Sequence, residues 1–237
     1  GGTTQDATID TVISTQQRTG IPTAPHLSGI GSEKTQIRDL LNLYKEKGIN
    51  RIVALRGDLP SGMRDIGEFT YANDLVEFIR TETGDHFQIE IAAYPEKHPQ
   101  SKNFDLDIDN FGLKVKAGAD RAITQYFFNA DAYFNFVDQL QKRQIDIPVL
   151  PGIMPITNFT QMARFSDVIG AEIPRWLRKQ FESYGDDQES IQQLGNEFIT
   201  KMCQQLLDQG APGLHFYSMN KTEPSKAIWN NLGLSND

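Results

Sequence analysis

The strongest chemical signal in the sequence is a cation, a glycine and a carboxylate in succession, Arg56-Gly57-Asp58, directly after an apolar run. A glycine lets the backbone approach a bound group closely, and loops after buried strands often carry binding residues. The Arg56 guanidinium could hold a phosphate or pyrophosphate by a two-pronged contact. Asp58 could anchor an amidine-like edge or place negative charge beside a redox ring. A structural salt bridge at a strand end is an equally good interpretation.

A second candidate is the segment YPEKHP at residues 94–99, in which two prolines fix the backbone around an aromatic ring and an imidazole. Such a stiff loop can present Tyr94 and His98 to a ligand, although His98 can equally stabilise the loop or face solvent. The histidines at positions 26, 86, 98 and 215 lack metal-binding spacings such as H-E-x-x-H. We therefore expect no metal centre.

A third candidate is Gln125, near the end of the apolar segment 121–127. An amide is costly to bury unpaired, so Gln125 either hydrogen-bonds a ligand or pairs with neighbouring backbone, and both interpretations stay open. Phe165, on a later helix, could stack on a flat ligand or belong to the core. Nucleophilic catalysis has little support, because the sequence has no G-x-S-x-G motif and Cys203 lies within a predicted helix.

Composition narrows the class of protein. The 237 residues include 23 Lys+Arg against 31 Asp+Glu, a net charge of −8, which argues against a nucleic-acid partner but not against a small anionic ligand. A single cysteine excludes a disulfide framework. No apolar run reaches the roughly 18 residues of a membrane helix, and the polar first twenty residues do not form a signal peptide. We expect a cytoplasmic protein without membrane contact.

Strand-like apolar runs alternate with helix-period segments along the chain, which predicts βαβ units and a parallel sheet. In segment 33–47, for example, Ile37, Leu40, Leu41 and Tyr44 follow helical spacing. The predicted strands are 21–27, 51–56, 88–94, 121–127, 147–153 and 213–217, and the predicted helices are 33–47, 72–82, 111–117, 130–143 and 189–209.

The choice is then between an open doubly wound sheet and a closed barrel. No G-x-G-x-x-G or P-loop motif occurs, and polar residues gather after the strands, where (β/α)8 barrels build their active sites. We predict an α/β protein of the (β/α)8 TIM-barrel class, with six of the eight strand–helix units in this chain. Residues 1–237 would form a single barrel domain lacking its first two strands, with no regulatory domain.

Taken in order, the motifs resemble the bacterial methylenetetrahydrofolate reductases, and the resemblance extends from about residue 1 to residue 234. The motifs are Ala24-Pro25-His26-Leu27-Ser28, Leu55-Arg56-Gly57-Asp58, Ala93-Tyr94-Pro95-Glu96-Lys97-His98-Pro99, Arg121-Ala122-Ile123-Thr124-Gln125, Pro151-Gly152-Ile153-Met154-Pro155 and His215-Phe216-Tyr217-Ser218-Met219-Asn220.

This resemblance implies a flavin-bearing barrel that reduces 5,10-methylenetetrahydrofolate to 5-methyltetrahydrofolate, feeding methionine synthesis. FAD would carry hydride from NADH, or less readily NADPH, to the folate in a ping-pong sequence on one shared site. The missing dinucleotide motif agrees with direct binding of NADH at the flavin. The family forms homo-oligomers, so we expect one here.

The resemblance also assigns residues by position. It places the FAD contacts at His26, Leu55, Arg56, Gly57, Asp58, Tyr71, Ala72, Tyr94, His98, Ser101, Asp107, Asn110, Leu113, Lys114 and Ile123. It places the folate contacts at Asp58, Gln125, Gln161, Phe165 and Lys221, with Asp58 and Gln125 as the catalytic pair. Tyr217 is a further expected substrate contact, because its ring can supply aromatic contact.

Elementary chemistry agrees with these roles. FAD is dianionic, and Arg56, Lys114 and His98 supply local positive charge in an acidic chain. Negative charge on Asp58 beside the flavin would help the reduced ring release hydride. The Gln125 amide offers both a donor and an acceptor to a pterin edge.

Two departures from the family pattern matter. The family's general acid is a glutamate on the first barrel strand, which would precede Gly1, so no glutamate here is given that role. Lys221 stands where better-known members carry arginine, which keeps the charge but loses the fork geometry. Residues 63–68 have no assigned role. The alternatives are a flavin-free barrel that binds a pterin or another small molecule, and a non-catalytic binding protein.

Overall fold

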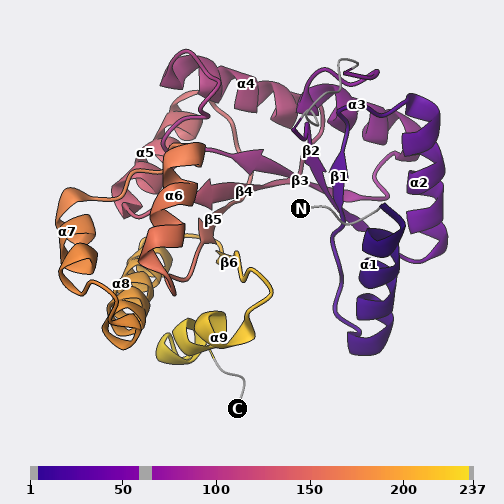
Figure 1. The fold of residues 1–237 in the computed structure, drawn as a ribbon. Helices are drawn as coiled ribbons and strands as arrows, with labels where there is room; N and C mark the ends of the chain where they lie inside the picture. The colour runs from indigo at the N-terminus through magenta and orange to yellow at the C-terminus, as the bar shows by residue number, and fades with distance from the viewer. Residues whose placement is uncertain (1–4, 59–65, 235–237) are drawn as a thin grey trace. The chain divides into compact units, whose positions relative to one another are not determined.

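The computed structural model describes residues 5–58 and 66–234, in which six strands alternate with helices (Figure 1). The elements in chain order are α1 (Gln5–Thr19), β1 (His26–Ser28), α2 (Lys34–Glu46), β2 (Arg51–Leu55), α3 (Ala72–Thr83), β3 (Gln88–Ala93), α4 (Phe104–Lys116), β4 (Arg121–Tyr126), α5 (Ala130–Lys142), β5 (Val149–Ile153), α6 (Phe159–Ile169), α7 (Arg175–Ser183), α8 (Gln188–Asp208), β6 (His215–Phe216) and α9 (Thr222–Asn231).

The chain forms two compact units, residues 1–92 with 110–122, and residues 93–109 with 123–237. In the first unit β1, β2 and β3 are parallel neighbours, with Ser28 opposite Leu55 and Ile52 opposite Ile89. Helix α3 packs on β2 and on α2. The core side chains of α2 are the four predicted from helical spacing, Ile37, Leu40, Leu41 and Tyr44, all at most 6% exposed.

In the second unit β5 and β6 are parallel, with Gly152 opposite His215. The Gly152 N–H donates to Thr124 Oγ1 of β4 at 2.8 Å. A Cβ added at Gly152 would lie 2.1 Å from the Thr124 carbonyl oxygen and 2.7 Å from the Tyr217 ring. Glycine at this position therefore lets β4, β5 and the end of β6 approach closely. Helix α8 packs on β5, α5 and α9, and buries Cys203 completely.

The predicted α/β class with six parallel strands is confirmed, but the first strand is wrong in its bounds. Strand β1 begins at His26, whereas the sequence predicted residues 21–27. Pro22 and Pro25 cannot donate to a sheet ladder, so the paired segment begins only after Pro25, whose carbonyl accepts the Val53 N–H at 2.9 Å. The last strand is likewise shorter than predicted, at His215–Phe216.

Helix α4 begins at Phe104, seven residues before the predicted start at Phe111. The segment between is rich in Asp, which has low intrinsic helix propensity. Acidic residues are nevertheless favourable in the first turn, and Asn103 Oδ1 accepts the Leu106 N–H at 2.8 Å as a cap. Helix α1 was not predicted at all. In the described ranges no helix is long and apolar enough to cross a membrane.

Part of the segment without an assigned role, residues 63–65, lies outside the described residues. The following residues support the start of α2. The Gly31 N–H donates to the Ile66 carbonyl at 2.9 Å, and the Lys34 N–H donates to Glu68 Oε2 at 2.7 Å. A carboxylate at a helix N-terminus compensates unpaired N–H groups, so Glu68 has a structural role there.

Candidate functional site

A pocket of about 150 Å³ lies in the second unit, among the loop after β5, helix α6, the segment after β6 and the start of α9. Barrel enzymes build their sites from segments that follow the strands, and this pocket has that construction. The folate contacts predicted at Gln161, Phe165, Tyr217 and Lys221 all line it. The remaining lining residues are Met154, Pro155, Thr157, Asn158, Met162, Ser218, Met219 and Pro224.

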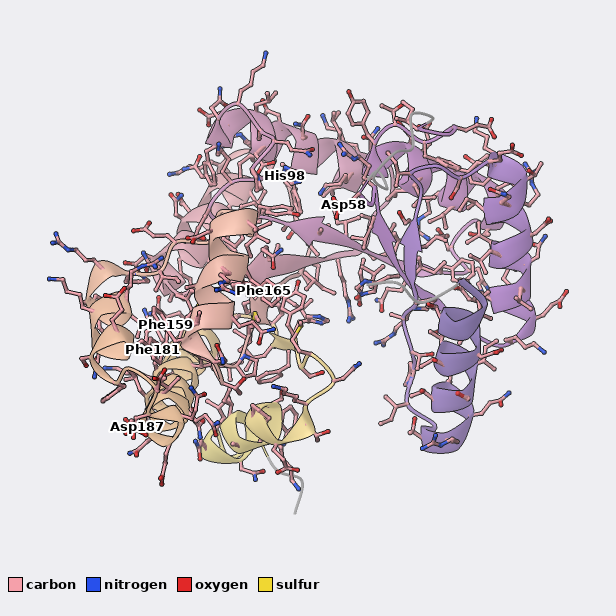
Figure 2. The ribbon with its side chains drawn as sticks, in the orientation of Figure 1. Asp58, His98, Phe159, Phe165, Phe181 and Asp187 are labelled. Carbon is pink, nitrogen blue, oxygen red and sulfur yellow. The ribbon has the colours of Figure 1, made fainter. Side chains whose placement is uncertain are left out.

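Helix α6 presents two of these residues from one face. Gln161 and Phe165 are four residues apart, one helical turn, and Phe165 is 38% exposed. Figure 2 shows Phe165 on α6. The next face of the helix carries Met162 and Ser166, both buried. The N-cap residue of the helix is Asn158, whose side-chain oxygen accepts the Gln161 N–H at 2.8 Å. This cap sets the position of Gln161 and is itself part of the pocket lining.

The ring of Tyr217 forms one wall of the pocket. Its hydroxyl donates to the Thr124 carbonyl oxygen at 2.9 Å, so the ring, not the hydroxyl, is available to a ligand. Burial raises the pKa of Tyr217 to about 12, which keeps the hydroxyl protonated as a donor. The Tyr126 ring meets the Tyr217 ring at 72°, with centroids 6.4 Å apart. These two contacts hold the Tyr217 ring, the predicted aromatic contact for a ligand, in one position.

Lys221 is exposed and immediately precedes α9. A tight turn places it there: Met219 and Asn220 have φ of 50° and 58°, and the Lys221 N–H donates to the Ser218 carbonyl at 2.8 Å. Left-handed conformations are uncommon for a residue such as Met219, and such residues concentrate at functional sites. The turn leaves one cation at the edge of the pocket.

Gln125 is half-buried on β4, and its Oε1 accepts the Tyr126 N–H at 3.0 Å. This hydrogen bond corresponds to the alternative in which Gln125 pairs with neighbouring backbone. Gln125 is not one of the residues that line the pocket. Its predicted contact with a pterin edge therefore stays a prediction.

The loop after β3 assembles several predicted flavin contacts. The Tyr94 and His98 rings meet edge to face, with centroids 4.4 Å apart. The His98 N–H donates to Asp107 Oδ2 at 2.8 Å, and His98 Nδ1 accepts the Gln100 N–H at 3.1 Å. Nδ1 is thus an acceptor, which places the proton of a neutral His98 on Nε2. Ser101 is half-buried in the same loop, and Ile123 is buried on β4.

In the first unit, the end of β2 carries another group of predicted flavin contacts. Gly57 has φ of 83°, and a Cβ there would lie 1.8 Å from Ser28 Oγ, so only glycine fits.

Leu55 and Arg56 are half-buried and Asp58 is exposed. The Leu55 and Arg56 carbonyls accept the N–H groups of Gly29 and Ile30 at 3.0 and 2.8 Å. His26, exposed, lies on the neighbouring strand β1.

Helices α3 and α4 supply the other contacts predicted in this unit. Tyr71 precedes α3, is 60% exposed, and its N–H donates to Asp74 Oδ2 at 2.8 Å; Ala72 is the first helical residue. On α4, Lys114 Nζ donates to the Ala92 carbonyl at 2.5 Å. Asn110 and Leu113 are exposed on the same helix.

The donor chemistry of these residues fits FAD. Arg56 and Lys114 are half-buried cations, and a dianionic pyrophosphate requires such charges. Within the described ranges no group of three or more His, Cys, Asp or Glu side chains could hold a metal ion. Burial raises the pKa of Cys203 to about 12, so this thiol is unreactive, as its helical position predicted.

Sequence reasoning expected the segment 155–159, with Thr157 and Asn158, at the site face, and it assigned no site role to Met154, Met162, Ser218, Met219 and Pro224. Asn158 carried a usable signal, since asparagine is a preferred helix N-cap. The methionines carried none, because a methionine at helical spacing is ordinary core.

The alternating topology and a pocket built from segments after the strands define a protein of the TIM-barrel class. Its fold is similar to a Clostridium thermocellum protein that binds two copies of 5-methyl-5,6,7,8-tetrahydrofolic acid (TM-score 0.61, 18% identity, covering 92% of this chain and 74% of that one). It is also similar to a phosphonopyruvate hydrolase in complex with oxalate and Mg²⁺ (TM-score 0.51, 12% identity, 98% and 75% covered). At such identities these similarities show the fold alone.

Sequence similarity is more specific. The profile of the methylenetetrahydrofolate reductase family matches residues 1–233. The chain is 39% identical over 235 residues to 5,10-methylenetetrahydrofolate reductase of Pectobacterium carotovorum, covering 98% of this chain and 77% of the relative. The Escherichia coli K12 enzyme is 39% identical over 230 residues, with 97% and 76% covered. The chain belongs to the methylenetetrahydrofolate reductase family.

Proposed function

We propose that this protein reduces 5,10-methylenetetrahydrofolate to 5-methyltetrahydrofolate, with NADH or NADPH as the electron donor and FAD as the cofactor. The observation that carries the proposal is the pocket in the second unit. It brings Gln161 and Phe165 of α6 together with Tyr217 and Lys221, which lie far from α6 along the chain, and all four are predicted folate contacts. Membership of the family supplies the reaction class.

Each pocket residue has chemistry that suits part of a folate. The exposed face of Phe165 and the fixed ring of Tyr217 offer aromatic contact to a flat ring. The Gln161 amide can donate and accept hydrogen bonds, and the Lys221 ammonium can pair with a carboxylate. A volume of about 150 Å³ is below the 300–1,000 Å³ usual for a whole drug-sized ligand. The pocket therefore holds one ring and the start of the tail.

The proposed FAD contacts are Arg56 and Lys114 in the first unit and, separately, the loop residues Tyr94 and His98 in the second; FAD when bound would supply hydride transfer between nicotinamide and folate. Arg56 and Lys114 provide charge for the pyrophosphate, and Tyr94 and His98 provide a rigid aromatic pair. Asp58 and Gln125 keep their proposed catalytic roles, Asp58 through its charge and Gln125 through its amide. The proposal assigns the proton donor to none of the described residues. A cytoplasmic homo-oligomer stays a prediction.

The visible spectrum of the purified protein, before and after anaerobic addition of NADH, tests the proposal. We expect a flavin band that bleaches with NADH, or with NADPH, and returns when methylenetetrahydrofolate is added. A colourless protein that fails to take up added FAD would contradict the flavoenzyme assignment. If that protein still bound 5-methyltetrahydrofolate, the flavin-free pterin-binding alternative would replace it.

A further inference from the structure

The loop after β3 is joined to the segment that follows α6. Glu96 Oε2 accepts the backbone N–H of Glu172, which lies between α6 and α7, at 3.1 Å. In the same region the Pro99 ring lies over Gly170, the C-cap of α6, since a Cβ added at Gly170 would be 3.7 Å from Pro99 Cγ. Two contacts therefore connect this loop to the end of α6.

The loop adopts a costly backbone conformation to make these contacts. Lys97, next to Glu96, has φ of 114°, a region that residues with a side chain rarely adopt. Lys97 Nζ donates to the Ser101 carbonyl at 3.0 Å, which closes the loop on itself. Such conformations are energetically unfavourable and persist only where the surrounding structure determines them. The direction of the Glu96 side chain is thus built into the loop.

Glu96 is a half-buried carboxylate, and its partner Glu172 is an exposed residue. Burial raises its pKa to about 7, the charge of Glu172 adds to that rise, and the hydrogen bond from the Glu172 N–H opposes it. The charge of Glu96 also contributes to raising the pKa of Tyr126, after burial of that hydroxyl.

Tyr126 in turn reaches the middle of α6. Its hydroxyl lies 3.3 Å from Ser166 Oγ, and Ser166 is 1% exposed. The helix is thus fixed at its middle by the Tyr126–Ser166 contact and beyond its end by the Glu96–Glu172 contact. Ser166 is adjacent in sequence to Phe165, which lines the pocket.

We propose that Glu96 is a positioning residue for the substrate: by accepting the Glu172 N–H it holds α6, with Gln161 and Phe165, in register with the loop that carries Tyr94 and His98. The substrate part of this assignment rests on the proposed function. Without the acceptor, α6 would have to be ordered when the ligand binds, and part of the binding free energy would be lost to that ordering. The effect should fall on KM and not on kcat.

The test compares Glu96→Met, which keeps similar volume without an acceptor, with Glu96→Gln, which keeps an acceptor without the charge. We expect Glu96→Met to raise the KM for methylenetetrahydrofolate about tenfold and to leave kcat within about twofold. Amide hydrogen exchange of residues 159–173, measured without substrate, should be faster by a similar factor. Glu96→Gln should show neither the raised KM nor the faster exchange, because it keeps the acceptor. Glu172→Gln is the matched control, because Glu172 contributes its backbone N–H to this contact.

Unchanged exchange and unchanged KM in Glu96→Met would overturn the proposal, and so would a Glu96→Gln variant that behaves like Glu96→Met. If Glu96→Met fails to fold, Glu96→Ala replaces it, with thermal unfolding checked first. A wild-type protein that shows the Glu96-dependent protection of α6 but binds no 5-methyltetrahydrofolate would refute the proposed function and the substrate role of Glu96. It would leave only the structural link.

Discussion

The end of β2 and the pocket around α6 are the two proposed binding surfaces, and they are built in opposite ways. At the end of β2 three consecutive residues, Arg56-Gly57-Asp58, supply charge and shape, and the backbone itself forbids any residue but glycine at position 57. The pocket draws its lining from residues 154 to 224, carried on one strand loop, two helices and a turn. The first surface is determined locally and the second by packing.

This difference predicts how each surface responds to mutation. Where the backbone conformation is the functional feature, a substitution destabilises the unit before it affects binding. Where side chains project from a stable helix into a pocket, a substitution weakens binding and leaves stability nearly unchanged.

The largest expected effect is on the first surface. Gly57→Ala would force a side chain into a φ of 83° and place its Cβ 1.8 Å from Ser28 Oγ. We expect a loss of about 2–4 kcal/mol in the free energy of unfolding, measured by urea denaturation. The double variant with Ser28→Gly should recover part of the loss, because it removes the closest clash and leaves the backbone strain. A fully stable Gly57→Ala would refute local determination of this surface.

The second effect is on the pocket. Phe165→Ala should weaken binding of 5-methyltetrahydrofolate about tenfold to thirtyfold, because it removes the aromatic face of α6. Its unfolding free energy should change by less than about 1 kcal/mol, since the ring is 38% exposed. Val168→Ala is the matched control on the same helix, at a side chain that is 78% exposed and does not line the pocket. Isothermal titration calorimetry measures the affinity of both variants for 5-methyltetrahydrofolate. Equal affinities of Phe165→Ala and Val168→Ala would refute the assignment of this pocket to folate.

The third prediction concerns pH and the link behind the pocket. A carboxyl with a folded-state pKa above its unfolded value binds its proton more tightly when folded, so stability falls as pH rises from about 4.5 through about 7. Glu96→Gln imitates the protonated form. It should therefore equal wild type near pH 4.5 and exceed it by about 1–2 kcal/mol above pH 7, after allowance for partial exposure.

Thermal unfolding of both proteins from pH 4.5 to 8 measures this difference. Other titrating groups, such as Glu90 in the first unit, whose pKa burial also raises, are present in both proteins and cancel. Parallel curves across the whole range would show that Glu96 is solvated in the folded protein.

The same contrast explains what could be predicted from the sequence. The helix α2, the parallel strands and Gly57 follow from local patterns, so spacing and residue type were sufficient. The bounds of β1 were wrong because two prolines outweigh an apolar pattern, and the start of α4 was wrong because an asparagine cap and the helix dipole outweigh low propensity. Lys97 and the Glu96–Glu172 contact had no local signal, because a backbone N–H donor 76 residues away is visible only after folding.

Gln161 and Lys221 were predictable only through the motif resemblance, whereas Phe165 was also a candidate from its residue type, with a core position as the alternative. Phe165 and Tyr217 are ordinary aromatic residues in helix and strand patterns, and no rule of spacing distinguishes a pocket wall from a core position. The fold creates the distinction by leaving Phe165 exposed beside Gln161 while Met162 and Ser166 turn inward.

The smallest expected effect tests the edge of the pocket. Lys221 is a single, exposed ammonium following a left-handed turn, and a lysine meets a carboxylate as a point charge. Lys221→Arg should tighten binding of 5-methyltetrahydrofolate by about twofold to fivefold, because a guanidinium can form two parallel hydrogen bonds to one carboxylate. Lys221→Met should weaken it, and the effect of both variants should shrink at high salt. Lys226→Met, on the same helix α9 but outside the pocket lining, controls for the loss of general positive charge. If Lys221→Met and Lys226→Met weaken binding equally, the cation at this edge acts through the overall field and not through a contact, and the pocket is bounded by its aromatic walls alone.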